Sequence, residues 1–373
     1  MPDNEAILIA AISGRALAES ARRGGYVPLV TDFFGDQDTL LRAEAYARLH
    51  GELALGIKEH ALVRALEKLC ERHRPVGIVC GTGFERRPQI LRTIAERWRL
   101  FGNDASIVAK VKNPEIVFSL CADLAIPCPQ WSWSTPSEPV DWLAKRRGGA
   151  GGSHVRPSQH VHGARAEIYY QRKVPGNPVA ALFLADGQCA IVLGFSEQWS
   201  SPTPHLPYRY GGAVRPANLA PSTAESLSSA VNRLAGGLSL VGLNSADFLV
   251  EDERIWFLEI NPRPGATLDI FEPPDGSLFA MHIAACSGML PAAPHYPEGA
   301  RASAIVYAES DIPSVPALDW PDWTADRPSA GSTIKAGQPL CTVYARGPAA
   351  ATAKAIAEQR REIVLAWASG RKS

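Results

Sequence analysis

The sequence has no excess of charge of either sign. Its 373 residues include 38 Lys and Arg and 38 Asp and Glu, so the formal net charge is zero. A charge-neutral chain gives no support for nucleic acid or a membrane surface as a partner. It also lacks a run of about 18 apolar residues, so no membrane-spanning helix is predicted. The segment MPDNEAILIAAISG has acidic residues where a signal peptide has basic ones, which predicts a cytoplasmic protein.

Cysteine and histidine patterns typical of metal or disulfide sites are also missing. The seven cysteines are scattered, odd in number and never spaced as CxxC. We therefore expect reduced thiols rather than disulfides or a zinc site. His154, His160 and His162 do not have metal-ligand spacing on one helix face, and loop or core positions are favoured over a metal cluster.

The composition, 46% hydrophobic and 20% charged, is typical of a soluble globular protein. The length predicts two or three domains, and there is no internal repeat. Apolar runs at 5–12, 26–32 and 76–80 predict buried strands, with helices over 15–25 and 88–98. This β-α-β beginning predicts a small α/β domain over 1–103. The loop Gly81–Glu85 after the third strand is either a plain tight turn or a substrate-lining loop that presents Glu85.

The most informative stretch is DFLVEDERIWFLEINPRPGAT, residues 247–267. Two apolar runs around a short polar turn predict a β-hairpin. Alternate residues of a strand share a face, so Glu259, Asn261 and, if the strand continues, Arg263 point the same way. Asp247 on the partner strand supplies a second carboxylate. Mg²⁺ takes such oxygen ligands and arginine suits phosphate, so the pattern predicts a nucleotide-metal site. The alternative is an edge hairpin with solvated charges.

A second stretch pairs a lysine with glycines. Lys145 ends a predicted strand and is followed by Gly148, Gly149, Ala150, Gly151 and Gly152. Such a loop is flexible and lets backbone amides approach a phosphate closely. A surface hairpin loop is the alternative. No Lys-Ser/Thr pair follows the glycines, so it is not the phosphate loop of P-loop NTPases.

The remaining segments are predicted as follows. A strand over 164–175 ends in the polar residues Gln171-Arg172-Lys173, and a hairpin over 179–199 turns at Asp186-Gly187. Residues 199–221, which include Arg209 and Arg215, are predicted to form a functional loop or a long connection. Helices are expected over 223–238, 278–290 and 350–368.

The order of these parts resembles the ATP-grasp superfamily of ATP-dependent carboxylate ligases, in particular its biotin-carboxylase-like and carbamoyl-phosphate-synthetase-like branch. In detail the chain looks like an uncharacterised branch of predicted ATP-dependent carboligases. The resemblance implies a fold with α/β and α+β parts. A Rossmann-like pre-ATP-grasp domain (1–103) would precede a two-lobed ATP-grasp domain (104–299, with a small lobe at about 128–198). A small β-rich C-terminal segment (300–373) would complete the core.

The resemblance also implies roles for residues. Asp247, Glu259 and Asn261 would bind Mg²⁺ or Mn²⁺ that bridges the ATP phosphates. Lys145 would contact phosphate under a flap that contains Gly149, Gly151 and Gly152. Gln171, Arg172 and Val174 match the stretch that meets adenine, where the family more often begins with Glu. Arg263, Lys145 and Arg215 would act in catalysis. The sequence departs from the family at Pro114, which stands where a phosphate-binding lysine is usual; Lys110 and Lys112 lie nearby.

The implied activity is a carboxylate–amine ligase that forms an amide through an acyl-phosphate and converts ATP to ADP and phosphate. Small-molecule carboxylate and amine substrates of anionic character are implied, as is a homodimer. Relatives in methylotrophs accompany tetrahydromethanopterin and methylofuran metabolism, which suggests glutamate addition during the biosynthesis of a one-carbon cofactor. Two alternatives stay open. One is bicarbonate-dependent carboxylation through carboxyphosphate, against which Thr267 stands where biotin carboxylases place a Glu base. The other is a non-catalytic ATP-binding protein, which the lysine missing at Pro114 suggests.

Overall fold

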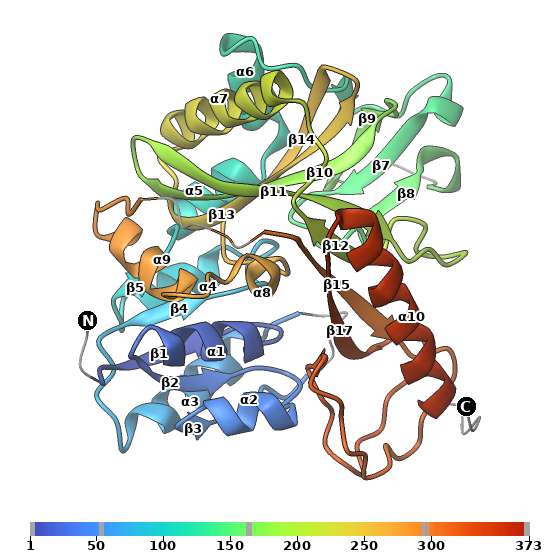
Figure 1. The fold of residues 1–373 in the computed structure, drawn as a ribbon. Helices are drawn as coiled ribbons and strands as arrows, with labels where there is room; N and C mark the ends of the chain where they lie inside the picture. The colour runs from blue at the N-terminus through green and yellow to red at the C-terminus, as the bar shows by residue number, and fades with distance from the viewer. Residues whose placement is uncertain (1–3, 52–55, 162–165, 293–295, 297, 369–373) are drawn as a thin grey trace.

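The computed structural model describes residues 4–51, 56–161, 166–292, 296 and 298–368. Its strands form three sheets of five, eight and four strands. Figure 1 shows the blue N-terminal domain below, the large sheet across the middle and the small sheet at the upper right. The predicted combination of α/β and α+β parts is confirmed.

The N-terminal domain is a parallel sheet with the strand order β3-β2-β1-β4-β5. Its strands are β1 (Ala6–Ala10), β2 (Val27–Thr31), β3 (Ala45–Tyr46), β4 (Ile78–Cys80) and β5 (Leu100–Phe101). Its helices are α1 (Arg15–Arg23), α2 (Gln37–Arg42), α3 (Glu59–Cys70) and α4 (Gln89–Ala95). Both faces of a parallel sheet are covered, which is why β1 is apolar throughout. The strand order reverses between β1 and β4, and the loops after these strands meet where Ile12 N donates to Thr82 O at 2.9 Å.

Two short helices lead out of this domain. They are α5 (Ala105–Val111) and α6 (Pro114–Asp123). The Asp104 carboxylate caps α5 by accepting from the backbone N–H groups of Ser106 and Ile107, and Asn113 caps α6 in the same way through Glu115 N. Lys112 is therefore fixed in the turn between two capped helices.

The small sheet has the order β6-β9-β7-β8. Its strands are β6 (Trp131–Ser132), β7 (Trp142–Arg146), β8 (Val155–Pro157) and β9 (Ile168–Arg172), with short 3₁₀ turns at Pro139–Asp141 and Ser158–His160. The glycine-rich segment 148–152 connects β7 to β8. Of the strand predicted over 164–175, residues 164 and 165 lie outside the described part of the chain.

The large sheet has the order β14-β13-β10-β11-β12-β15-β17-β16. Its strands are β10 (Asn177–Asp186), β11 (Ala190–Ser200), β12 (Tyr210–Arg215), β13 (Val241–Glu251), β14 (Arg254–Asn261), β15 (Ala300–Tyr307), β16 (Thr324–Ala325) and β17 (Pro339–Gly347). Its helices are α7 (Pro221–Leu238), α8 (Leu268–Phe271), α9 (Leu278–Cys286) and α10 (Ala350–Ala368). Both predicted hairpins, β10–β11 and β13–β14, are present as antiparallel pairs.

Strand β12 corrects the prediction of a long connection over 199–221. It pairs with β11 on one side and β15 on the other. Glycine has a low strand propensity, so Gly211-Gly212 hid this strand from a sequence pattern. A Cβ atom on Gly212 would lie 2.3 Å from the carbonyl oxygen of Ser303, so the close approach of β15 requires glycine there.

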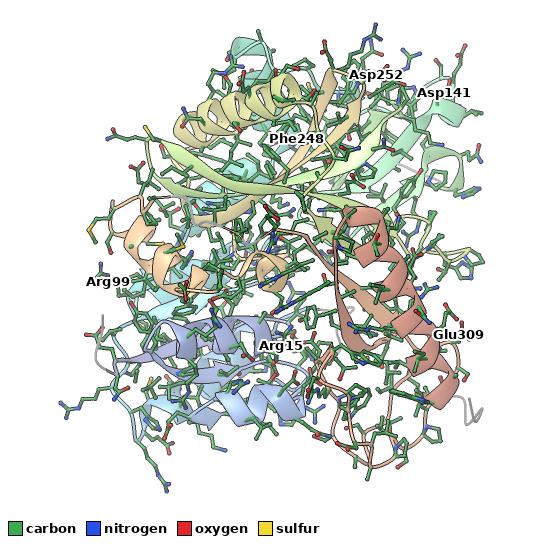
Figure 2. The ribbon with its side chains drawn as sticks, in the orientation of Figure 1. Arg15, Arg99, Asp141, Phe248, Asp252 and Glu309 are labelled. Atoms are coloured by element: carbon green, nitrogen blue, oxygen red, sulfur yellow. The ribbon has the colours of Figure 1, made fainter. Side chains whose placement is uncertain are left out.

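The two faces of the large sheet have different partners. One face packs against α7 through Phe183, Phe248, Phe257 and other residues of a buried cluster, and Figure 2 shows Phe248 below this helix. The opposite face, which includes Leu182 and Leu184, packs against α8, α9 and the N-terminal domain. Within the described ranges, no helix has the length and hydropathy that a membrane span would need.

A β-bulge sets the faces of β14. Asp247 pairs with Glu259 but Phe248 pairs with Phe257, so Leu258 is an extra residue on this strand. As a result Phe257 and Ile260, three positions apart, both enter the core beside α7. Glu259 lies opposite Asp247 on the face toward the N-terminal domain.

Arg15, at the start of α1, joins three parts of the chain. Its guanidinium donates to both carboxylate oxygens of Asp269 at 2.6 Å, to Asp326 Oδ1 at 3.2 Å and to the Tyr344 hydroxyl at 2.7 Å. Figure 2 shows Arg15 where the N-terminal domain meets the rest of the molecule. This network fixes the N-terminal domain against α8 and the C-terminal strands.

Candidate active site

The three residues predicted to bind metal lie together on one face of the large sheet. Asp247 on β13 is directly opposite Glu259 on β14, and Asn261 follows two positions later. Asn261 Nδ2 donates to Asp247 Oδ2 at 2.9 Å. Gln198 on β11, which the sequence analysis did not single out, donates from Nε2 to Asp247 Oδ1 at 3.2 Å. The strand periodicity within the hairpin therefore gave the correct placement of the trio.

Lys112 completes this cluster. Its buried ammonium donates to Asn261 Oδ1 at 3.2 Å and lies 3.6 Å from Glu259 Oε2. Lys110, the other lysine near the position of Pro114, is exposed on α5. Pro114 stands where the family usually has a phosphate-binding lysine. The turn between the capped helices α5 and α6 places Lys112 in the site instead. We call Lys112, Asp247, Glu259 and Asn261 the carboxylate cluster.

The two carboxylates of the cluster have opposite electrostatic properties. Burial opposes ionisation of Glu259, but Lys112, His154 and Lys145 outweigh it and hold the pKa at about 2. Burial, together with the negative charge of Glu259, raises the pKa of Asp247 to about 7. Two adjacent carboxylates that resist simultaneous ionisation are an environment in which a cation is favourable.

The donor set fits a magnesium ion that shares its coordination with phosphate. Among the described residues, no group of three His, Cys, Asp or Glu side chains could hold a metal by itself. Mg²⁺ usually takes one or two carboxylates and completes its shell with phosphate oxygens and water. Asp247, Glu259 and the amide oxygen of Asn261 are a set of this kind.

Lys145 is the second buried lysine of the site. It lies on β7 and is 7% exposed. Burial lowers its pKa, while the charges of Glu259 and Asp247 act against this effect. Its ammonium group forms no ion pair or hydrogen bond with another described residue, so it is available to an anion.

The glycine-rich flap, residues 148–152, is closed over the site. A Cβ atom on Gly152 would lie 1.7 Å from the carbonyl oxygen of Tyr208, and its φ is +69°. A Cβ atom on Gly148 would lie 2.6 Å from the carbonyl oxygen of Glu85. Tyr210 N also donates to Gly151 O at 3.0 Å. The flap therefore rests against both the N-terminal domain and the segment that enters β12.

His154 lies inside the pocket beneath this flap. The pocket is lined by Lys112, Arg146, Arg147, Gly149, His154 and Glu259, among other residues. Burial lowers the pKa of His154 to about 4, and its Nδ1 atom has no hydrogen-bond partner. His160 is exposed in a 3₁₀ turn, and His162 lies outside the described residues. Of the two described histidines of this trio, His154 is the one at the site.

The residues predicted to meet adenine are at the end of β9. Gln171 is 1% exposed, and its Nε2 atom has no hydrogen-bond partner. Arg172 is exposed and donates to Gln130 Oε1 at 3.3 Å, and Val174 is half-buried. A buried amide with a free donor is suited to a base or ribose.

Arg263 follows the end of β14 and is held by Glu85. Its Nε atom donates to Glu85 Oε1 at 2.8 Å, and Gly83 N donates to Glu85 Oε2 at 2.9 Å. Burial opposes ionisation of Glu85, but Arg263 and Lys112 hold its pKa below the usual range. The Gly81–Glu85 loop, predicted as either a plain tight turn or a substrate-lining loop that presents Glu85, thus directs Glu85 toward Arg263.

Arg215, which was predicted to act in catalysis, lies on β12. Strand β12 is separated from β13 by β11 and β10. Three strand spacings amount to about 14 Å. Arg215 donates to the carbonyl oxygen of Ile270, and its guanidinium lies over the ring of Tyr296 at 4.4 Å. Arg209 lies over the ring of Tyr307 at 3.7 Å and donates to Ser201 O at 2.9 Å, so it holds its own loop.

Comparison with known proteins agrees with this geometry. Residues 118–267 match the family model of the ATP-grasp domain. The structure is similar to a biotin carboxylase from Campylobacter jejuni in complex with a β,γ-ATP compound, with a TM-score of 0.75 and 15% identity, over 98% of this chain and 95% of that one. It is also similar to the biotin carboxylase domain of a 2-oxoglutarate carboxylase from Hydrogenobacter thermophilus, a dimer in complex with MgADP, ADP and bicarbonate (TM-score 0.74, 13% identity, 96% and 90% coverage).

A third similar structure is the pyruvate carboxylase of Rhizobium etli, with a TM-score of 0.72 and 15% identity. That match covers 98% of this chain and 39% of the longer carboxylase. At such identities the likeness is one of fold. The resemblance to the ATP-grasp superfamily is confirmed for residues 118–267 by the family model, and the biotin carboxylase structures share the fold of this chain.

Proposed function

We propose that this chain, which carries an ATP-grasp domain, is an ATP-dependent ligase that activates a carboxylate as an acyl-phosphate and transfers the acyl group to an amine. The observation that carries the proposal is the carboxylate cluster beneath a closed glycine flap, with Lys145 facing it. This arrangement provides oxygen ligands for a divalent cation and two buried ammonium groups for phosphate. Both are needed to hold ATP for phosphoryl transfer.

Each part of the nucleotide has a partner in this proposal. Asp247, Glu259 and Asn261 hold Mg²⁺, or Mn²⁺ in its place, and the ion when bound neutralises charge on the phosphate oxygens. Lys112 and Lys145 contact the phosphate chain. The free amide nitrogen of Gln171 takes an acceptor on the base or ribose.

The chemistry requires positioning and charge neutralisation rather than a protein nucleophile. A carboxylate oxygen of the substrate forms a bond to the γ-phosphorus as the bond from that phosphorus to ADP breaks. Arg263, oriented by Glu85, stabilises the negative charge of the reacting groups. The closed flap excludes water, which would hydrolyse the acyl-phosphate. The amine nitrogen then bonds to the acyl carbon, loses a proton, and phosphate leaves.

The finer details are also proposals. We infer an anionic acid substrate, and glutamate addition to a one-carbon cofactor precursor of the tetrahydromethanopterin or methylofuran type is the specific reaction that the sequence resemblance supports. A cytoplasmic homodimer is proposed on the same basis, and the Hydrogenobacter thermophilus structure, which is a dimer, supports this assembly.

Carboxylation through carboxyphosphate is the second candidate, which the fold shared with three carboxylases favours. Thr267, a buried residue at the N-cap of α8, has no acidic group to serve as the base expected at this position. A purely non-catalytic role was suggested by Pro114. The contacts of Lys112 with Asn261 and Glu259 support a catalytic role instead, because they place a lysine in the proposed site.

The test is ADP formation with Mg²⁺, ATP and a panel of carboxylates and amines that includes glutamate and pterin or furan precursors. Hydroxylamine in place of the amine should trap the acyl-phosphate as a hydroxamate. Glu259→Gln should abolish both signals, whereas Glu253→Gln, at an exposed residue of the same hairpin, should leave them unchanged. ADP formation that depends on bicarbonate and on no amine would favour the carboxylase. If nucleotide binds but Glu259→Gln changes no product with any pair, the ligase proposal fails.

A further inference from the structure

Three arginines lie side by side on neighbouring strands of the large sheet. Arg215 on β12 is directly opposite Arg301 on β15, which is directly opposite Arg346 on β17. Directly opposed residues of an antiparallel pair project to the same face. We call these three residues the arginine row. Like charges in such positions repel, so the row lowers stability unless something compensates it.

The protein itself compensates little of this charge. Within the described part of the chain, no carboxylate forms an ion pair with any arginine of the row. Glu272 accepts from Arg301 through its backbone oxygen, but its carboxylate pairs with Arg23 at 3.4 Å. A guanidinium has five N–H donors. Among the described residues, Arg215 uses one donor, to Ile270 O, and Arg301 uses one, to Glu272 O at 3.0 Å. The Arg346 guanidinium donates to no described residue.

Burial makes the uncompensated charge costly. Arg215 is 4% exposed. Burial, with repulsion from Arg301 and Arg346, lowers its pKa to about 10. The same causes, with Arg346 and Arg23 as the repelling charges, lower the pKa of Arg301. An anion bound to the row would stabilise the charged guanidinium groups and so raise the pKa values of Arg215 and Arg301.

Two polar groups beside the row also lack partners. The Tyr296 hydroxyl and the Glu272 Oε2 atom are both buried and form no hydrogen bond. The Tyr296 ring lies 4.4 Å from the Arg215 guanidinium. Burial raises the pKa of Glu272 to about 7, so its carboxyl group can donate a hydrogen bond near neutral pH. Unpaired buried polar groups are rare in folded proteins, and here they adjoin unused guanidinium donors.

The row is distinct from the carboxylate cluster. It shares a sheet face with that cluster, but three strand spacings, about 14 Å between the backbones, separate β12 from β13. Phe271 of α8 packs over β11 in between, because a Cβ atom on Gly194 would lie 2.6 Å from its ring. Arg346 is exposed and marks the open end of the row.

We propose that the arginine row, with the Tyr296 hydroxyl, is a binding site for an oxyanion, a phosphate or carboxylate group of a small molecule that enters beside Arg346. The planar forks of the guanidinium groups suit both kinds of oxyanion. Tyr296 provides a further donor. The site does not depend on the proposed ligase reaction, because no residue of the row contacts the carboxylate cluster.

The test is calorimetric titration with inorganic phosphate and, separately, citrate, with sodium chloride at matched ionic strength in all buffers. Lys112→Met serves as the background, since it weakens phosphate binding at the carboxylate cluster. In this background we expect phosphate or citrate to bind, and the preferred ion distinguishes a phosphate group from a carboxylate as the ligand. Arg346→Gln should weaken the binding at least tenfold, as should Arg301→Gln.

The matched control is Arg254→Gln, at an exposed arginine of β14, the strand at the other edge of the large sheet. In the Lys112→Met background this change should leave the affinity for the ion unchanged. If Arg301→Gln does not fold, Arg346→Gln alone decides, because Arg346 is exposed and has no bonded partner to lose among the described residues. The proposal is overturned if neither ion binds the Lys112→Met protein, or if Arg346→Gln and Arg254→Gln bind with equal affinity.

Discussion

Replacing Lys112 with methionine tests the centre of the proposed site. The change removes the ammonium that lies 3.2 Å from Asn261 Oδ1 and 3.6 Å from Glu259 Oε2, and keeps most of the side-chain volume. At 3.6 Å and an effective dielectric constant of about 20, the attraction to Glu259 is about 5 kcal/mol. Its loss should raise the pKa of Glu259 from about 2 toward the ordinary value of a glutamate, about 4.3, which still leaves this carboxylate ionised at pH 7.

Nucleotide affinity should therefore fall through the loss of a cation rather than through protonation of a metal ligand. A charge-assisted hydrogen bond contributes about 1.5–3 kcal/mol, which predicts a Kd for a non-hydrolysable ATP analogue about 10–100-fold higher. The assay is isothermal titration calorimetry with Mg²⁺. Lys110→Met, at the exposed lysine two positions earlier, should leave the Kd unchanged within twofold. Equal losses in the two variants, or unchanged affinity in Lys112→Met, would refute the reasoning.

Three further predictions concern the flap, a buried acid and a domain contact. Gly152→Ala should reduce ADP formation at least a hundredfold, because its Cβ atom would collide with Tyr208 O, whereas Gly151→Ala, with a similar φ of +62° and no atom within 4 Å, should cost less than tenfold. The raised pKa of Glu272, about 7 when folded against about 4.3 when unfolded, means that stability falls as pH rises from about 4.3 through 7. Glu272→Gln should make the free energy of unfolding, measured in urea, about 3 kcal/mol less dependent on pH across this range. Asn103→Ala should lower the free energy of unfolding by about 3 kcal/mol, because Val241 N, at 2.9 Å, and Pro262 O, at 3.0 Å, would both lose their buried partner; equal urea midpoints for variant and wild type would contradict this.

The sequence predicted features that depend on neighbouring residues. The alternation of polar residues in EIN placed Glu259 and Asn261 on one face, and the short turn brought Asp247 opposite them. Lys145 and the flap were found for a similar reason, because a strand followed by closely spaced glycines is visible in one short window. The predicted helix over 350–368 matches α10, since nothing in that segment interrupts it.

Features that depend on distant residues were not predictable in this way. Glu85 and Arg263 are 178 positions apart, and only the meeting of two domains reveals the pair. The choice between Lys110 and Lys112 depends on where α5 ends, a boundary that periodicity does not fix. The position of Arg215 beside Arg301 likewise depends on the order of strands in the large sheet, which no single stretch of sequence shows.

The bulge at Leu258 makes the site depend on the number of residues in β14 as well as on their identity. Because Leu258 is an extra residue, its side chain can be exchanged for another apolar one without moving Glu259 or Asn261 relative to Asp247. Deleting it would restore regular pairing and carry either Phe257 out of the core or Glu259 into it. In this strand, insertions and deletions are thus more harmful than substitutions, and a library that varies the hairpin should hold its length constant between Phe257 and Glu259.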